Sequence, residues 1–377
     1  MDSLDSLPDD VLFHHILPPL PTVSLVRCRY FCKSWPSIVR DPHFLALRQS
    51  FYPTSGHLLF VCPASAVATS ELQVFSAPIS PGQADPPLAT HIATIPNLNA
   101  SMVDVQCVNG LLCLHPKNSS NSKAFAHIFN PTTRQIITLP DDSSVRDKFR
   151  ASTHFGYDPI RDEFKVLRLL KYNDSHEFKI FTIGDATNSW KLVNNATATH
   201  IRPTNWFLED KRGVCVNGAI HWKYSSYILA FDLRSEQFRQ IDIPDGYKYK
   251  EHCRPHLKFP DLVELSGCLT LVGYDDRGLN LTILEDYETR EWTQKRIILP
   301  DGANERIHFP LCSVPKTGEI LLMPYFLGRL VRVIYHDKDK TSSRRAVVMK
   351  MLEPLWPDQK SGYINIFFYQ ENFRLLD

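Results

Sequence analysis

Residues 128–140 read Ile-Phe-Asn-Pro-Thr-Thr-Arg-Gln-Ile-Ile-Thr-Leu-Pro, and copies of this pattern recur along most of the chain. An apolar segment leads to Asn130, a residue type favoured at the start of a type I turn, and an aliphatic residue and a Leu-Pro stop follow. The same order is found around Asp232 and Asp286, without the proline stop around Asp185, where Trp190 follows, and in a weaker form around Asp337. These turn residues are spaced by roughly 50 residues, a length that accommodates one four-stranded blade of a β-propeller.

A second, independent marker is a turn centred on glycine. It occurs at Asn109-Gly110, Asn217-Gly218, Ser266-Gly267 and Thr317-Gly318. The last three are again roughly 50 residues apart, and the first lies about two periods before them. Two markers with one period predict an all-β propeller of about six kelch-like blades. A β-sandwich is the alternative, because it also has short strands, but the regular period favours the propeller.

The first fifty residues follow a helical pattern instead. Pro8 suits the first turn of a helix, and Leu12, Ile16 and Leu17 form an apolar stripe that ends at two prolines. Two further short helical pieces contain Leu25 and Trp35. The fold class is therefore α+β by domain. We expect a three-helix module over residues 1–50, a propeller over 51–350, and a C-terminal segment, 351–377, that closes or packs on the propeller.

Three short helices bury few side chains between them. We therefore expect the apolar surface around Leu25 and Trp35 to need a cover. That cover is either a partner protein or the rest of the same chain, and the pattern alone does not distinguish the two.

Composition narrows the class of protein. The formal net charge is +1, which gives no general attraction to nucleic acid or to anionic membranes. No apolar run approaches the ~20 residues needed to span a bilayer, and the acidic start Met1-Asp2 does not suit a signal peptide. The nine cysteines form no CxxC pair and indicate a reducing compartment. We expect a cytoplasmic or nuclear protein that binds neither nucleic acid nor membrane.

No catalytic or metal-binding constellation is evident. The chain contains no GxSxG, HExxH, P-loop or GxGxxG motif. Cys28 with Cys32, and His252 with Cys253 and His256, are incomplete as zinc sites. Trp190, Trp222 and Trp292 fall at repeat positions, where blade packing is favoured over a binding surface. We therefore expect no catalytic residue, no metal and no cofactor.

Several motifs, in order along nearly the whole chain, resemble one family. Residues 7–12 (LPDDVL), 16–17 (IL), 20–29 (LPTVSLVRCR) and 32–35 (CKSW) resemble the F-box motif of plant F-box proteins. Residues 107–113 (CVNGLLC), 129–134 (FNPTTR), 155–158 (FGYD) and 216–222 (VNGAIHW) resemble their F-box-associated interaction domain. His14-His15 and Tyr30-Phe31 depart from the usual F-box pattern.

The resemblance implies a substrate receptor of an SCF-type ubiquitin ligase. The F-box would bind a Skp-type adaptor, and through it a cullin–RING ligase, while the propeller would hold an unknown substrate protein. The adaptor contacts carried over by position are Leu7, Pro8, Ile16, Leu17, Leu20, Pro21, Leu25, Val26 and Trp35. A non-ligase interaction scaffold and a propeller enzyme are the alternatives.

Substrate contacts are expected on loops that interrupt the repeat, since scaffolded loops carry binding and Tyr, Trp and Arg are enriched at hot spots. The candidates are Arg202, Trp206, Phe207, Tyr247, Tyr249 and His252, with Arg212, Tyr224 and Tyr227 as weaker ones. Packing of these loops over a propeller face is the alternative interpretation.

Overall fold

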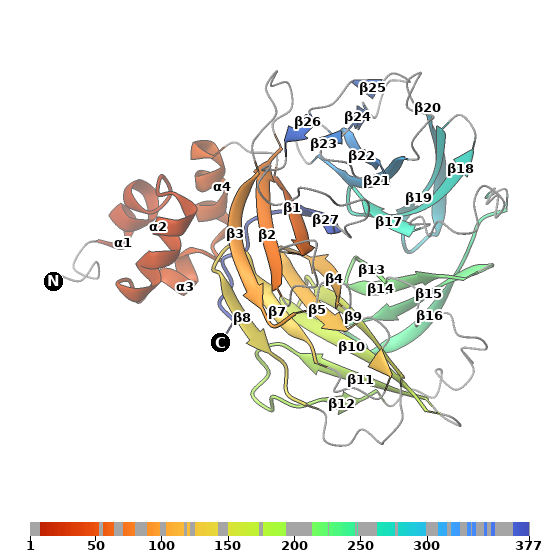
Figure 1. Cartoon of the computed structure of the whole chain (residues 1–377), viewed down its shortest axis with the longest axis horizontal. Coiled ribbons are helices and arrows are strands. Elements are labelled where there is room, and N and C mark those ends of the chain that lie inside the picture. Colours follow the sequence, from red (N-terminus) through yellow and green to blue (C-terminus); the bar gives the residue numbers. More distant parts are fainter. Residues whose placement is uncertain are drawn as a thin grey trace.

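The computed structural model shows a small helical module attached to the side of a ring of β-sheets (Figure 1). The structure describes residues 8–52, 56–63, 71–79, 89–98, 103–116, 119–120, 125–141, 150–172, 176–193, 213–224, 226–245, 247, 262–275, 278–298, 308–314, 318–324, 330–332, 334–336, 343–344, 348–350 and 365–376.

The helical module consists of short helical segments separated by prolines and caps. Its elements are α1 (Asp9–Val11), the π-helical η2 (Leu12–Ile16), α2 (Thr22–Arg27), the 3₁₀ turn η3 (Cys28–Tyr30), α3 (Trp35–Ile38) and α4 (Pro42–Phe51). The segment that begins at α1 ends before Pro18 and Pro19, as their missing N–H groups require.

Helix α4 corrects the expected three-helix module. The sequence pattern predicted three helices over residues 1–50, whereas a further helix, α4, extends over ten residues after Asp41. The Asp41 side chain accepts hydrogen bonds from the amides of His43 (2.7 Å) and Phe44 (3.3 Å), and Pro42 occupies the first turn. Asp41 and Pro42 are therefore the residues that start α4, Asp41 as its N-cap and Pro42 in its first turn.

The β-sheets follow one another around the ring in chain order. The first sheet contains β1 (His57–Pro63), β2 (Glu71–Pro78), β3 (Thr90–Pro96) and β27 (Asn365–Tyr369), and the second contains β4 (Val103–Val108), β5 (Leu111–Pro116), β7 (His127–Asn130) and β8 (Gln135–Thr138). The third sheet has five strands, which are β6 (Ser119–Ser120), β9 (Arg150–Asp158), β10 (Glu163–Lys171), β11 (His176–Thr182) and β12 (Lys191–Leu192).

Three further four-stranded sheets follow. They contain β13 (Val214–Val216), β14 (Ala219–Lys223), β15 (Tyr227–Asp232) and β16 (Gln237–Asp242); then β17 (Leu262–Leu265), β18 (Cys268–Asp275), β19 (Gly278–Asp286) and β20 (Glu291–Ile298); and then β21 (His308–Ser313), β22 (Ile320–Pro324), β24 (Ile334–His336) and β25 (Ser343–Arg344). In addition, β23 (Leu330–Arg332) pairs with β26 (Val348–Lys350).

These sheets correct the expectation of about six kelch-like blades, since five four-stranded blades are formed by the described residues. Among the described residues five sheets have four strands, one has five strands, and one is a two-stranded pair. The fifth strand of the larger sheet is β6, a two-residue segment that pairs with Ala151 and Arg150 of β9. Within each larger sheet neighbouring strands are antiparallel, as in a propeller blade.

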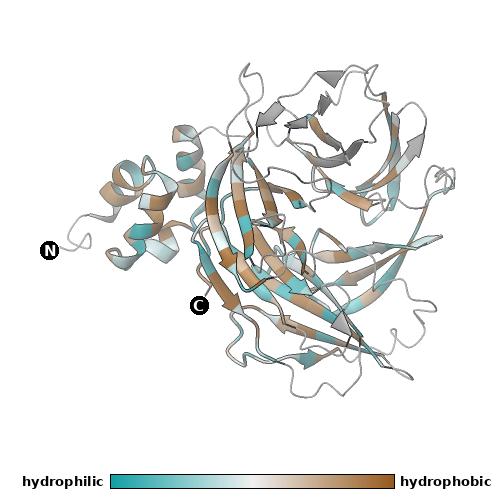
Figure 2. Cartoon of the chain, viewed as in Figure 1, coloured by the Kyte–Doolittle hydropathy of each residue, from teal (hydrophilic) through white to brown (hydrophobic). Residues whose placement is uncertain are grey.

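The core lies between neighbouring sheets, because the central strands are buried on both faces. Many residues of these strands are hydrophobic (Figure 2). In β5, Leu112 and Leu114 pack toward β1 and β2, whereas Leu111 and Cys113 pack toward β9 and β10. The same alternation recurs in the central strands of later sheets, as the two-residue period of a strand requires. Trp222 belongs to one of these inter-sheet clusters, and Trp190 and Trp292 pack against two others.

Both sequence markers are turns, as expected, where the structure describes them; Thr317 and Asp337 lie outside the described residues. The pairs Asn109-Gly110, Asn217-Gly218 and Ser266-Gly267 have positive φ at both residues, which is the hairpin turn whose twist matches the strands. At Asn130, the side-chain Oδ1 accepts hydrogen bonds from the amides of Thr132 (2.9 Å) and Thr133 (3.3 Å). Asp286 makes the same pair of bonds in its own turn. The recurring Asn and Asp residues therefore shape the turns between strands.

The ring is completed by a strand from the far end of the chain. β27 pairs antiparallel with β1, so that Phe368 lies opposite Leu58 and Tyr369 opposite His57. β27 also lies beside β4 and β21, the first strands of two other sheets. The residues that follow β27 then reach the helical module.

Candidate functional site

The helical module has its own well-packed core. Leu17, Leu25 and Trp35 are completely buried in it, and the Trp35 indole N–H donates a hydrogen bond to the Leu25 carbonyl oxygen (2.8 Å). Val26 is 8% exposed. These four residues were expected to contact an adaptor, but their side chains are enclosed by the chain itself. They support the surface of the module instead of forming it.

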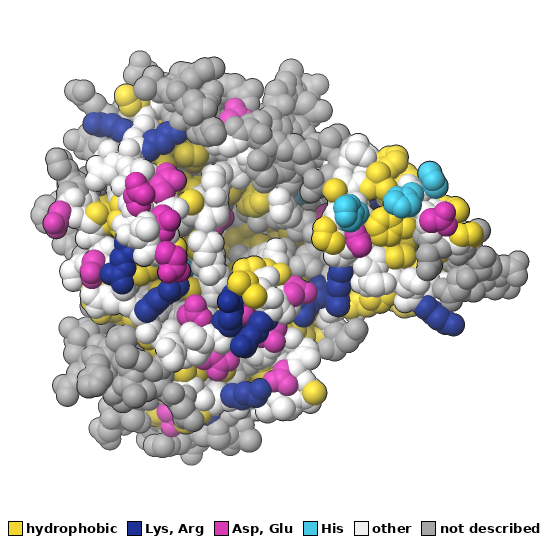
Figure 3. All heavy atoms as spheres, turned by 180° about the vertical axis from the view of Figure 1, so that it is seen from behind, with side chains coloured by type: hydrophobic (Ala, Val, Ile, Leu, Met, Phe, Trp, Pro, Cys, Tyr) yellow, Lys and Arg dark blue, Asp and Glu magenta, His cyan; other side chains and the backbone are white. Residues whose placement is uncertain are grey.

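Other expected adaptor residues remain at the surface. Pro8 and Pro21 are exposed, Ile16 and Leu20 are half-buried, and Leu7 lies outside the described residues. The sequence analysis did not include Val23, Tyr30 and Phe31 among the contacts, yet they are 45%, 70% and 56% exposed. His14 and His15 are exposed as well. Hydrophobic and histidine side chains thus gather on the surface of the module, as Figure 3 shows from behind.

Arg48 organises the loop that carries part of this surface. Its side chain, 4% exposed on α4, donates to the carbonyl oxygens of Pro18 (3.2 Å) and Leu20 (2.6 Å). It also donates to the Thr22 hydroxyl (2.9 Å). A buried guanidinium with several fixed acceptors holds the segment between η2 and α2 in one conformation. The surface formed by Leu20 and Pro21 is therefore preorganised.

A segment distant in sequence completes the core of the module. Phe373 is 5% exposed and packs with Leu17, Trp35 and their neighbours, and Leu375 packs against the same cluster. Either a partner or the same chain could have covered these helices, and for this part of the surface the cover is the same chain. Only the apolar character of Phe373 and Leu375 hinted at this contact.

The propeller candidates are described only in part. Tyr247 is half-buried, packs against Ile228 and its neighbours, and donates a hydrogen bond to the Val272 carbonyl oxygen (3.1 Å). The rings of Tyr224 and Tyr227 stack at 4.8 Å. Arg202, Trp206, Phe207, Arg212, Tyr249 and His252 lie outside the described residues. Tyr247 is therefore anchored to the propeller, and it stays a candidate for substrate binding.

Buried polar side chains connect three neighbouring sheets. The Gln106 amide N donates to the Thr153 carbonyl oxygen (2.7 Å) and lies 2.8 Å from His115 Nε2. The Trp222 indole donates to His154 Nδ1 (3.3 Å), and Ser152 Oγ lies 2.8 Å from the other ring nitrogen. Burial lowers the pKa of His154 to about 3, and the nearby His115 lowers it in the same direction. These groups are consistent with a neutral structural network, and the described residues contain no cluster of three or more metal-ligating side chains.

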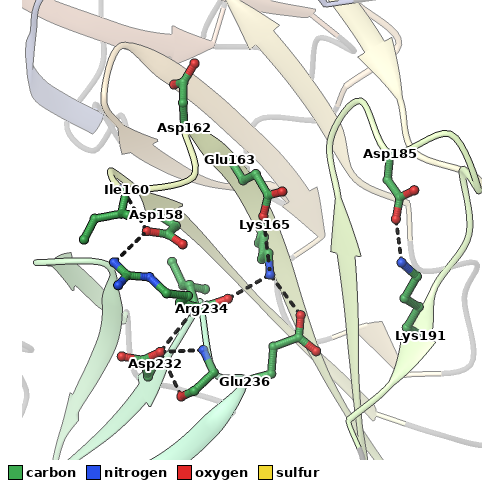
Figure 4. Close-up of polar contacts among 12 residues, drawn as sticks. Asp158, Ile160, Asp162, Glu163, Lys165, Asp185, Lys191, Asp232, Arg234 and Glu236 are labelled. Carbon is green, nitrogen blue, oxygen red and sulfur yellow. Dashed lines mark hydrogen bonds and ion pairs between the residues drawn. The ribbon is translucent and has the colours of Figure 1, made fainter.

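Ion pairs join the five-stranded sheet to the sheet after it (Figure 4). Lys165 is 2% exposed, and its Nζ donates to the Leu233 carbonyl oxygen (2.8 Å) and pairs with Glu236 (2.9 Å). Arg234 lies 3.5 Å from the buried carboxylate of Asp158. Lys191, in β12 of the five-stranded sheet, and Asp185, in the turn after β11, form a more exposed pair at 2.5 Å. The two sheets are thus held by polar contacts as well as by their shared apolar core.

None of the described helices is long and apolar enough to cross a membrane. All eight described cysteines are free thiols, including the completely buried Cys113.

Comparisons with known proteins agree with this architecture. A model of the F-box domain matches residues 4–47, and a model of the F-box associated beta propeller domain matches residues 57–370. A putative F-box protein of Arabidopsis thaliana is 28% identical over 352 residues, covering 92% of this chain and 86% of the relative. Another F-box protein of that plant, named DOR, is 25% identical over 373 residues, covering 93% and 90%.

Solved structures are more distant. A prolyl endopeptidase is 10% identical, with a TM-score of 0.40, over 87% of this chain and 56% of the endopeptidase. The WD40 domain of SCAP from fission yeast has a TM-score of 0.34 and 8% identity, over 74% of each chain. At these values the likenesses say nothing about what this chain binds or does. The two family models cover most of the chain in the observed order, and the chain therefore belongs to the F-box proteins that carry an F-box associated β-propeller domain.

Proposed function

We propose that this protein is the substrate receptor of an SCF-type ubiquitin ligase. The helical module binds a Skp-type adaptor and through it a cullin–RING ligase, and the propeller holds the protein to be ubiquitinated. Such a receptor contributes proximity and needs no catalytic residue of its own. We place it in the cytoplasm or nucleus, where buried thiols such as Cys113 stay reduced.

The exposed apolar surface of the module carries this proposal. Pro21 and Val23 begin α2 at the surface, and Ile16 and Leu20 border them, although the module has a complete core beneath. Apolar side chains left outside a packed core are typical of a surface that a partner covers. We therefore assign adaptor contact to Pro8, Ile16, Leu20 and Pro21, with Leu17, Leu25, Val26 and Trp35 as the support beneath them.

Binding of a purified Skp-type adaptor tests the proposal. Pro21 is the N-cap residue of α2, and aspartate is a favoured N-cap, so Pro21→Asp places a charge on the surface without weakening the helix. We expect Pro21→Asp, alone and with Ile16→Asp, to lower adaptor affinity at least tenfold. Ala46→Asp, at an exposed position of α4, is the control and should bind normally.

The outcomes separate the possible roles. No binding by the folded native chain would refute the receptor proposal. Binding that Pro21→Asp leaves unchanged would show that the adaptor uses another surface. Binding without ubiquitin transfer in a reconstituted ligase, tested on candidate substrates and on the receptor itself, would favour an interaction scaffold.

A further inference from the structure

The segment Gln370–Leu376, here called the strap, follows β27 and passes between the helical module and the propeller (Figure 1). It forms neither helix nor strand, so hydrogen bonds from other elements must satisfy its backbone. Its side chains are divided between the two domains.

Two strap residues bind the helical module. Phe373 inserts into the module core, and the Arg48 guanidinium lies over its ring at 5.4 Å. The Glu371 carboxylate accepts a hydrogen bond from the Thr22 hydroxyl and lies 3.5 Å from Arg48 Nε. Arg48 therefore links the strap to the same loop, residues 18–22, that carries the exposed apolar surface.

On its other side the strap is hydrogen-bonded to the propeller, mainly through the backbone groups of the strap. The Asn130 side-chain amide donates to the carbonyl oxygens of Asn372 (2.9 Å) and Arg374 (2.7 Å). Thr132 Oγ1 accepts from the Asn372 amide (2.9 Å), and the Asn372 side chain donates to the Asn109 carbonyl oxygen (2.7 Å). These bonds fix the middle of the strap on the turns of the second sheet.

The end of the strap reaches the third sheet. Leu376 packs in the core shared by β5, β7, β9 and β10. The Arg374 guanidinium donates to the Asp162 carbonyl oxygen (2.6 Å) and lies 3.2 Å from its carboxylate. Asp162 lies in the turn between β9 and β10, next to the FGYD stretch. Three of the stretches that identify the propeller domain in the sequence thus lie at or beside one strap.

Gly110 shows how closely the strap approaches. A Cβ atom at this position would lie 2.6 Å from the Gln370 carbonyl oxygen and 2.7 Å from the Asn372 Cβ. Gly267 has nearly the same φ, +79° against +80°, in the same kind of turn, but no atom lies within 4 Å of its Cβ position. A side chain at position 110 would therefore clash with the strap, and it would also strain the positive φ of the turn.

We propose that the strap sets the orientation of the helical module relative to the propeller, and that Asn130, Glu371 and Phe373 are positioning residues. Phe373 and Leu375 are the members of the module's apolar cluster that come from outside the first fifty residues. The strap thus adds a second connection between two domains that already follow one another along the chain, from the end of α4 to the start of β1.

The consequence for ubiquitin transfer rests on the proposed receptor function. A bound substrate must lie within reach of a conjugating enzyme carried by the ligase, and reach depends on the angle between module and propeller. Loosening the joint spreads the substrate over many positions and lowers its effective concentration at the enzyme.

Distance measurement between spin labels tests the proposal without an adaptor or substrate. Labels on ketone-bearing side chains at Arg40 and Leu192, both exposed, leave the native cysteines unmodified. We expect one narrow distance distribution for the native chain and for Gly267→Ala. We expect a distribution at least twice as wide for Gly110→Ala and for the pair Glu371→Gln with Phe373→Ala.

Controls separate uncoupling from misfolding. Phe238→Ala removes a core phenylalanine of similar burial far from the strap, 6% exposed against 5%, and should leave the distribution narrow. Glu371→Gln alone removes only the ionic contact and keeps the module core intact, and it should broaden the distribution slightly. Equal, narrow distributions in all variants, or a broad one in the native chain, would overturn the proposal. Failure of adaptor binding would refute the receptor function and leave this result standing.

Discussion

Replacement of Asn130 by aspartate separates the two tasks of this side chain. Asn130 is completely buried, and its Oδ1 closes its own turn while its Nδ2 donates to two strap carbonyl oxygens. Asp keeps the size and the turn acceptor, but a carboxylate cannot donate. The substitution therefore removes the strap contacts and retains the turn.

The expected loss of stability is large. Each strap carbonyl oxygen left without its donor costs about 1–3 kcal/mol, and the buried carboxylate adds its own desolvation cost. We expect Asn130→Asp to lower the free energy of unfolding by about 3–5 kcal/mol at pH 7, out of roughly 5–15 kcal/mol for a typical domain. Burial beside two carbonyl oxygens raises the pKa of the new carboxyl above its unfolded value, so the loss should shrink as the pH falls toward about 4 and the group is protonated.

Urea unfolding followed by tryptophan fluorescence, at pH 7 and pH 4.5, measures both effects. The reverse substitution at an equivalent turn, Asp286→Asn, is the control. Asp286 accepts from two turn amides in the same way but is exposed, and its bonds stay within its own turn, so the change should be much smaller than that of Asn130→Asp. Equal stability of Asn130→Asp and the native chain at pH 7 would refute the anchoring role of Nδ2.

Three further measurements address other buried polar groups. Lys165→Met should destabilise the propeller by about 1–2 kcal/mol, since Leu233 O loses its donor while Glu236 can still reach water, whereas Lys191→Met at the exposed pair should cost clearly less; urea titrations of the two variants that gave equal losses would contradict this. The pKa of His154 falls from an ordinary 6.5 to about 3 on folding, so its contribution to stability is complete above pH 6.5 and about 2–3 kcal/mol is lost by pH 4.5. Melting temperatures of the native chain should therefore drop more over this range than those of His154→Gln, and parallel curves would be the contrary result. Trp35→Phe removes the indole donor to the Leu25 carbonyl oxygen, which keeps only the Cys28 amide, and leaves space in the module core. It should destabilise the helical module by about 1–3 kcal/mol, seen as faster amide exchange in α4 with unchanged exchange in β10; uniform change in both would argue against a local effect.

Local patterns were predictable from the sequence because their causes are local. Asn130 and Asp286 bond amides two and three residues onward, and Gly110 and Gly267 adopt positive φ within their own hairpins. The turn markers and their period followed from these bonds. The period did not specify how many strands each sheet gains, and β6 joins the five-stranded sheet through only two paired residues.

Long-range contacts were not predictable in the same way. Leu17, Leu25 and Trp35 have the spacing of an apolar face, and spacing cannot say whether that face meets a partner or another part of the chain. Their cover, Phe373, is itself an ordinary apolar residue near the other end of the sequence. Arg48 and Glu371 are equally unremarkable until the fold brings them together. Only the burial of each side chain in the structure therefore distinguishes the core residues of the module from the surface residues that we propose as adaptor contacts.

β27 takes part both in closing the ring and in placing the strap. Because β27 pairs with β1 and lies beside β4 and β21, it completes the ring, and because the strap follows it directly, the same pairing delivers Phe373 to the helical module. The module cannot obtain its full core from the first fifty residues alone. Its final packing therefore depends on a propeller whose first sheet already contains β27. The same pairing that closes the ring therefore also places the residue on which our proposal for the orientation of the module depends.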